Sequence, residues 1–104
     1  MAKIIRLKAD LARKVLEGKK IITIRVGKIK INPGDIIEIH ARFPVVKAKV
    51  IDIKHKKIKD LTKKELKMDG YESIEELIKD LSKMYKKKID ENTKVTVIIF
   101  EPII

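Results

Sequence analysis

The chain has 104 residues, enough for one domain, and its 44% hydrophobic and 39% charged residues allow a modest core inside a charged exterior. Cysteine is absent and histidine occurs only at positions 40 and 55, which excludes disulfides and thiolate chemistry and predicts no dedicated metal site. No apolar run approaches the roughly 20 residues of a membrane span, and the amino end does not resemble a signal peptide. We therefore expect a single cytoplasmic domain over residues 1–104, with no cofactor and no membrane contact.

The formal net charge of +11 is distributed unevenly along the chain. Residues 1–60 contain 17 lysines and arginines against 6 acidic residues, whereas residues 61–104 contain 9 of each. This asymmetry favours an anionic partner, with nucleic acid as the first candidate. A lysine-rich surface without a partner explains the charge equally well, because the absence of glutamine and the Lys/Glu bias are typical of thermophile proteins.

Short β-branched runs predict five strands. Between the second and third strands, Pro33 and Gly34 in NPGD occupy the positions that a type II turn requires. The basic run KHKKIK, residues 54–59, is interpreted as a solvated edge. The predicted strands cover residues 3–7, 21–26, 36–41, 45–54 and 94–100.

Three helices are predicted from capping residues and from apolar residues at helical spacing. The first follows Asp10, which is a suitable N-cap. Thr62 with Glu65, and Ser73 with Glu76, have the spacing of capping boxes for the second and third helices. The third helix carries an amphipathic stripe that we expect to be core: Ile74, Leu77, Ile78, Leu81, Met84 and Tyr85.

The order of elements is thus β-α-β-β-β-α-α-β. The strands at 36–41 and 45–54 are joined too tightly for a parallel crossover, so this pair is expected to be antiparallel. Several β-branched strands with helices packed outside them predict an α+β fold, namely a small mixed, partly closed β-barrel of about five strands with flanking helices.

The segment EGKKIITIRVG, residues 17–27, places polar side chains on an otherwise apolar strand. Thr23 is the only hydroxyl of that strand, and a nearby Lys20 can activate it as a nucleophile if burial lowers the pKa of the lysine. Arg25 can bind a carbonyl, phosphate or carboxylate. Strict alternation puts Lys20 on the opposite face, so it reaches Thr23 only if the chain is still turning out of Gly18. Thr23 as an ordinary β-branched strand residue remains an open alternative.

Other functional signatures are scarce. The four glycines are too scattered for a phosphate-binding loop, and no Ser-His-Asp arrangement is supported. The chain has four aromatic residues, of which Phe43 is the one we expect to be able to stack on a base.

The segments EGKKIITIR, NPGDIIEI, KVIDIKHKKIKDLT, DGYESIEEL and VTVIIFE, in this order, resemble the ASCH domain of the PUA-like superfamily. The resemblance runs from about Leu7 to Glu101. It implies a small β-barrel with flanking helices, a cleft over the strand that bears the threonine, and an association with RNA. Its most recognisable element is G-x-K-x-x-T-x-R, here Gly18, Lys20, Thr23 and Arg25.

Some small ASCH proteins are amidohydrolases that deacetylate N4-acetylcytidine. Carried over to this chain, the resemblance implies Thr23 as nucleophile and Lys20 as its activator, with the acid/base position at Asp69, immediately before Gly70. The chain departs from the family here, because the family has a glutamate at the acid/base position and often a polar residue where Ile21 stands.

Three hypotheses follow from the sequence. The first is an RNA- or nucleoside-binding module that uses a basic cleft around Lys20, Thr23 and Arg25, with Gly18 and Phe43 as further ligand contacts. The second is an amidohydrolase acting on N4-acetylcytidine through Lys20, Thr23 and Asp69. The third is a small basic protein in which Arg25 has a structural role, paired with Asp69 or Glu101. A monomer is assumed in each case.

Overall fold

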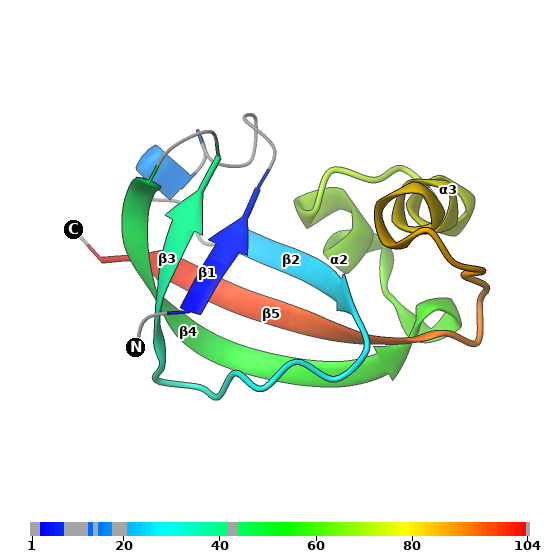
Figure 1. Ribbon diagram of the computed structural model, residues 1–104, viewed down its shortest axis with the longest axis horizontal. Coiled ribbons are helices and arrows are strands. Elements are labelled where there is room, and N and C mark those ends of the chain that lie inside the picture. The colour runs from blue at the N-terminus through cyan, green and yellow to red at the C-terminus, as the bar shows by residue number, and fades with distance from the viewer. Residues whose placement is uncertain (1–2, 8–12, 14, 18–20, 42–43, 104) are drawn as a thin grey trace.

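The computed structural model describes residues 3–7, 13, 15–17, 21–41 and 44–103. The helix predicted after Asp10 lies largely outside this range, although the described residues 13, 15 and 16 are helical. The helical elements are a short 3₁₀ helix η1 (Ile58–Asp60), α2 (Lys63–Met68) and α3 (Ile74–Tyr85). The strands are β1 (Lys3–Arg6), β2 (Ile21–Val26), β3 (Ile36–His40), β4 (Pro44–Lys57) and β5 (Lys94–Pro102) (Figure 1).

The five strands form one mixed sheet in the order β1-β3-β4-β5-β2. Only β1 and β3 are parallel, and the tightly connected pair β3–β4 is antiparallel, as predicted. The α+β class is thereby confirmed. The sheet is not closed into a barrel, because β1 and β2 are its two edge strands. The Arg25 side chain of β2 nevertheless links the two edge strands, since its Nη2 donates a hydrogen bond to the carbonyl of Arg6 at the end of β1.

Strand β4 is longer than predicted, continuing to Lys57 instead of ending at Lys54. Residues 44–49 of β4 pair with β3 and residues 48–57 pair with β5, and the β4–β5 pairing has a register shift between Val50 and Asp52, just after the β3 pairing ends. Such an irregularity bends a strand and increases its twist. The lysine-rich end of β4 is strand because it pairs with the start of β5, from Lys94 to Val97, and this pairing is not visible in the local sequence.

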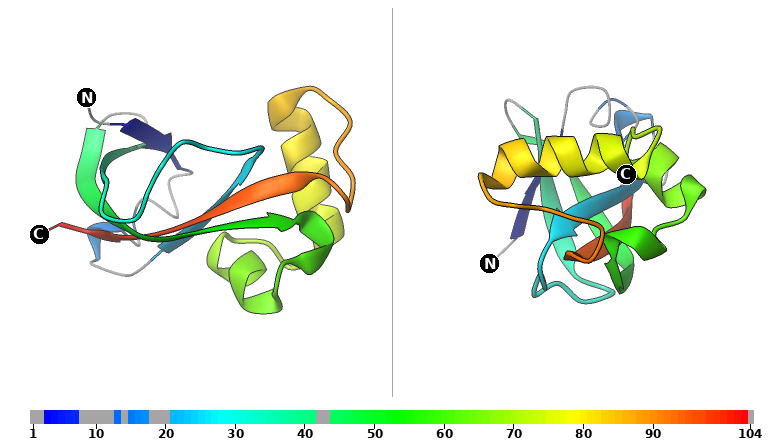
Figure 2. Two further views of the ribbon diagram at one scale, coloured as in Figure 1. Left: turned by 90° about the horizontal axis from the view of Figure 1, so that it is seen from below. Right: turned by 90° about the vertical axis from the view of Figure 1, so that its right-hand side faces the viewer.

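Strand β2 separates two hydrophobic cores and contributes to both. Ile21 packs in the first core with residues of β3, β4 and β5, whereas Ile22, Ile24 and Val26 belong to the second core with α3. This explains the nearly continuous apolar run IITIRV, because a strand that is buried on both faces loses the alternation of polar and apolar residues. The helices α2 and α3 gather at one end of the sheet, where β2, β4 and β5 extend beyond β1 and β3 (Figures 1 and 2).

The predicted caps of both late helices are present. Thr62 and Glu65 form a complete capping box at α2. At α3, the Ser73 hydroxyl accepts from the Glu76 amide, but the Glu76 carboxylate reaches one residue further back, to the amide of Glu72.

The apolar stripe of α3 is core at Leu77 and Leu81. The prediction that Met84 is also core was wrong, because this side chain is 53% exposed. In the predicted turn, Gly34 has a φ of +94°, which glycine adopts without strain. No helix among the described residues is long and apolar enough to cross a membrane.

Candidate functional site

The outer edge of β2 is covered by side chains that follow or end the two late helices. The Ile24 amide donates to Asp69 Oδ2 at 3.1 Å, and the Val26 amide donates to the Tyr85 hydroxyl at 3.3 Å. An edge strand leaves its outward amides without a ladder partner, and an uncapped buried amide is costly. Asp69, the C-cap residue of α2, therefore has a structural task in addition to any chemical one.

A small cavity lies where this covered edge meets the end of β1. We call it the Thr23 cleft, and its volume is about 40 Å³. Leucine and isoleucine side chains form part of its wall. Its other lining residues are Arg6, Thr23, Arg25, Asp69, Tyr71 and Met84.

Two polar groups of the Thr23 cleft are shielded from solvent. Thr23 is 2% exposed, and it lies on the same face of β2 as Arg25, as strict alternation predicts. The Arg25 Nε is buried and has no hydrogen-bond partner among the described residues. A buried donor in this state is available to an incoming acceptor, because binding would remove its desolvation cost.

Tyr71 closes the cleft on the helix side. It is buried, and its hydroxyl donates to Asp80 Oδ2 on α3. Burial is the main cause that raises the pKa of the Tyr71 phenol, and the hydrogen bond to Asp80 and the nearby Asp69 charge raise it further. The phenol therefore remains protonated at neutral pH. It serves the cleft as a fixed polar wall and not as a base.

Three of the six predicted site residues, Thr23, Arg25 and Asp69, line one cleft. Gly18, Lys20 and Phe43 lie outside the described residues. Sequence reasoning did not identify Tyr71 or Met84 as site residues, and their place at the cleft results from how α2 and α3 dock on β2. In the sequence, Met84 was assigned to the core stripe, and Tyr71 was visible only as part of the segment DGYESIEEL.

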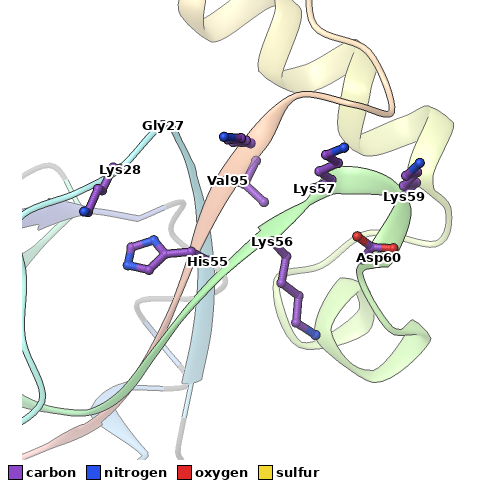
Figure 3. Close-up of a pocket in the computed structure, with 9 residues that line it drawn as sticks. Gly27, Lys28, His55, Lys56, Lys57, Lys59, Asp60 and Val95 are labelled. Atoms are coloured by element: carbon purple, nitrogen blue, oxygen red, sulfur yellow. The ribbon is translucent and has the colours of Figure 1, made fainter.

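A second and much larger hollow lies where β4 ends and β5 begins, with a volume of about 660 Å³. We call it the basic groove (Figure 3). Asp60 is the one carboxylate among the residues that line it. Its basic lining residues are Lys28, His55, Lys56, Lys57, Lys59 and Lys94.

Lys56 differs from the other lysines of the groove. Its Nζ lies 2.9 Å from Oε1 of Glu65 on α2, and the pair is largely shielded, with side-chain exposures of 23% and 7%. Figure 3 shows Lys56 pointing away from His55 and towards α2. This lysine is therefore engaged in joining β4 to α2, which leaves four lysines to give the groove its charge.

Comparison with protein-family models gave no match, and comparison with curated proteins gave none. Solved structures do match over nearly the whole chain. The hypothetical protein PH0355 is 29% identical with a TM-score of 0.71, covering 99% of this chain and 100% of that one. An ASCH domain from Lactobacillus crispatus is 9% identical with a TM-score of 0.70, covering 96% and 79%. ASCH from Zymomonas mobilis is 19% identical with a TM-score of 0.62, covering 95% and 68%. The chain thus has the fold of ASCH domains, as the sequence resemblance implied.

Proposed function

We propose that this ASCH-fold protein binds RNA and holds one nucleoside, or a free modified nucleoside, in the Thr23 cleft. The observation that carries the proposal is the convergence of a hydroxyl, a guanidinium and a carboxylate, from Thr23, Arg25 and Asp69, on one small cavity. The net charge of +11 supports RNA as the source of the nucleoside.

The three groups complement the edge of a cytosine. Single-stranded RNA is recognised through hydrogen bonds to the edges of unstacked bases. A guanidinium such as that of Arg25 donates to a ring carbonyl, and a carboxylate such as that of Asp69 accepts from the exocyclic amine of cytosine. A uracil offers a second carbonyl in place of the amine, which would face the carboxylate unfavourably. The cleft therefore favours a cytidine over a uridine.

Entry of a base requires movement at the rim of the cleft. A volume of about 40 Å³ holds only a few water molecules, far less than the ~300 Å³ of the smaller ligand pockets. Met84 stands at this rim with a flexible side chain that is half exposed, so it can move aside at little cost in packing. Displacement of Met84 is accordingly part of the proposed binding event.

A second candidate function is the deacetylation of N4-acetylcytidine, favoured by the presence of Thr23 and Asp69 in the same cleft. Asp69 accepts from the amide of Ile24, the neighbour of Thr23, and is thus held beside the proposed nucleophile. Thr23 Oγ1 would attack the acetyl carbonyl carbon after losing its proton to Lys20. The C–N bond would break as the proton taken from Thr23 is delivered by Lys20, through Asp69, to the leaving amine. Water would then hydrolyse the acetyl ester to acetate and return a proton to Thr23.

Nucleoside binding is tested by calorimetric titration of cytidine and N4-acetylcytidine into the wild type, Thr23→Val and Arg25→Met. Arg25→Met should weaken binding roughly 5- to 160-fold, because a well-placed pair of hydrogen bonds to a base edge contributes about 1–3 kcal/mol. Arg13→Met is the matched control, since Arg13 is exposed and does not line the cleft. Equal affinity in all four proteins, each shown to be folded, would refute the cleft as the binding site.

Deacetylation is tested by acetate release from N4-acetylcytidine at elevated temperature. Turnover by the wild type that is abolished in both Thr23→Ala and Lys20→Ala would establish the hydrolase and its nucleophile. Turnover that survives in Thr23→Ala would exclude this mechanism. Binding without turnover would leave the cleft as a recognition site alone.

A further inference from the structure

The basic groove brings together lysines that repel one another. Lys57 of β4 stands directly opposite Lys94 of β5 in the antiparallel register. Like charges at directly opposite positions destabilise a sheet. Lys59 and Lys28 add two more ammonium groups, against Asp60 as the one lining carboxylate. These lysines form no ion pair with another described residue, and a cost in folding energy without such compensation is typical of a binding site for an anion.

The groove is also shaped by a buried hydroxyl. Thr96 is fully buried on β5, and its Oγ1 donates to the Gly27 carbonyl at 2.6 Å while accepting from the Ile29 amide at 3.2 Å. These two bonds fasten the segment after β2 against the β4–β5 ribbon. One wall of the groove, including Lys28, is therefore fixed in place before any ligand arrives.

The same hydroxyl orients His55. His55 Nδ1 lies 3.3 Å from Thr96 Oγ1. The Thr96 hydroxyl donates its single proton to the Gly27 carbonyl. In its contact with His55 the hydroxyl can therefore only accept, so Nδ1 is the donor. This contact fixes the orientation of the imidazole ring in the groove. In Figure 3 the ring extends from β4 towards the side on which Lys28 lies.

We propose that the basic groove binds successive phosphates of a single RNA strand. The groups that would bind the phosphates are the ammonium groups of its four remaining lysines, which line one hollow, namely Lys28, Lys57, Lys59 and Lys94. This inference rests on the proposed function in taking RNA as the ligand. It assigns the phosphate contacts to the far end of β4 and β5, apart from the cleft that takes the base.

An anionic membrane surface fits the groove less well. Surface binding of that kind needs exposed apolar side chains that enter the lipid. The large exposed apolar residues among those described are Ile4, Leu16, Ile36, Met84 and Ile103, and none of them lines the groove. A concave site whose lining charges are basic apart from Asp60 suits a chain of phosphates that lies within it.

The test compares two triple variants in binding a fluorescent single-stranded RNA of about 15 nucleotides over a range of salt concentrations. The groove triple replaces Lys57, Lys59 and Lys94 by Gln. The control triple replaces Lys47, Lys64 and Lys67 by Gln, which removes the same charge from exposed lysines that do not line the groove.

The groove triple should reduce the slope of log K against log salt by about 2, since each lost phosphate contact with a single strand removes about 0.7. Extrapolated from 1 M salt, that change lowers affinity roughly 100-fold at 0.1 M. The groove triple should also unfold about 1–4 °C higher than the wild type in the absence of RNA, because the opposed lysines are gone. The control triple should show neither effect.

Equal losses in the two triples would overturn the proposal, because the charge would then act diffusely. An equal or larger loss in binding to vesicles that contain anionic phosphatidylserine would also overturn it. The titration with free cytidine separates this proposal from the function of the cleft, since a nucleoside carries no phosphate. Suppose the groove triple reduces the salt slope for RNA while Thr23→Val and Arg25→Met leave cytidine binding unchanged. Phosphate binding in the groove is then supported, and nucleoside binding in the cleft is refuted.

Discussion

Replacement of Glu65 by alanine should cost more stability than any other single change at the helix caps that the structure describes. The Oε1 atom of Glu65 accepts from the Thr62 amide at 2.8 Å and from Lys56 Nζ at 2.9 Å. One carboxylate thus completes the capping box of α2 and attaches that helix to β4. Because Asp69 follows α2 directly, the same contact helps to position a wall of the Thr23 cleft.

The expected loss in the free energy of unfolding follows from these two hydrogen bonds. Loss of the cap contact costs about 1 kcal/mol, and loss of a hydrogen bond to a charged partner costs about 1.5–3 kcal/mol. Two effects reduce the sum. Lys56 can regain water, since its side chain is already 23% exposed. The Oε2 of Glu65 is buried without a hydrogen-bond partner among the described residues, and the alanine variant removes it. We expect a net loss of about 2–3 kcal/mol.

The assay is urea unfolding followed by circular dichroism, with Glu76→Ala as the matched control. Glu76 occupies the equivalent position of α3, but its side chain is exposed and accepts only from the Glu72 amide at 3.2 Å. It should lose no more than about 1 kcal/mol. Equal losses in the two variants would refute the argument, because the buried contact with Lys56 would then contribute nothing.

Three further predictions follow from the contacts described. Burial alone would raise the pKa of Glu65, but the hydrogen bonds from Thr62 and Lys56 and the Lys56 charge prevail and lower it below its ordinary value of 4.5. The carboxylate therefore contributes stability above pH 4.5 that is lost as the pH falls through the folded pKa. The stability advantage of the wild type over Glu65→Gln should shrink below pH 4.5 in acid titrations, and a constant advantage would contradict this. Thr96→Val should lose about 2 kcal/mol in urea unfolding, since the partly buried Gly27 carbonyl and the partly buried Ile29 amide lose their partner. A loss below ~0.5 kcal/mol would be inconsistent with that account. Met84→Ala should bind cytidine more tightly than the wild type in calorimetry, because the rim is opened, and weaker binding would show that Met84 is a contact instead.

Local signals in the sequence predicted the local structures well. The caps at Thr62 and Ser73 and the turn at Gly34 depend on residues within three or four positions of one another, so their spacing is visible in the chain. The contacts that build the sites are not local. The Asp69 contact with Ile24 spans 45 positions, and the Tyr85 contact with Val26 spans 59.

The basic groove shows the same limit. Some of its lysines were visible in the run KHKKIK, but an isolated run of this kind is as compatible with a solvated edge as with a binding site, and Lys28 and Lys94 lie elsewhere in the sequence. The sheet register places Lys57 opposite Lys94, and the Thr96 hydroxyl holds the Gly27 carbonyl. These contacts between distant segments make the run part of a concave surface. The resemblance to ASCH domains, by contrast, depended on the order of several segments and predicted the fold correctly.

The most direct test of the central claim is a titration of cytidine followed by the backbone amide signals of the ¹⁵N-labelled protein. Binding in the Thr23 cleft predicts saturable shifts concentrated at Thr23, Ile24 and Arg25, with the Ile24 amide affected most because its acceptor, Asp69, would engage the base. The groove residues Lys57 and Lys94 should be unaffected by a ligand that carries no phosphate. Absence of shifts at β2, or shifts confined to the groove, would contradict the account.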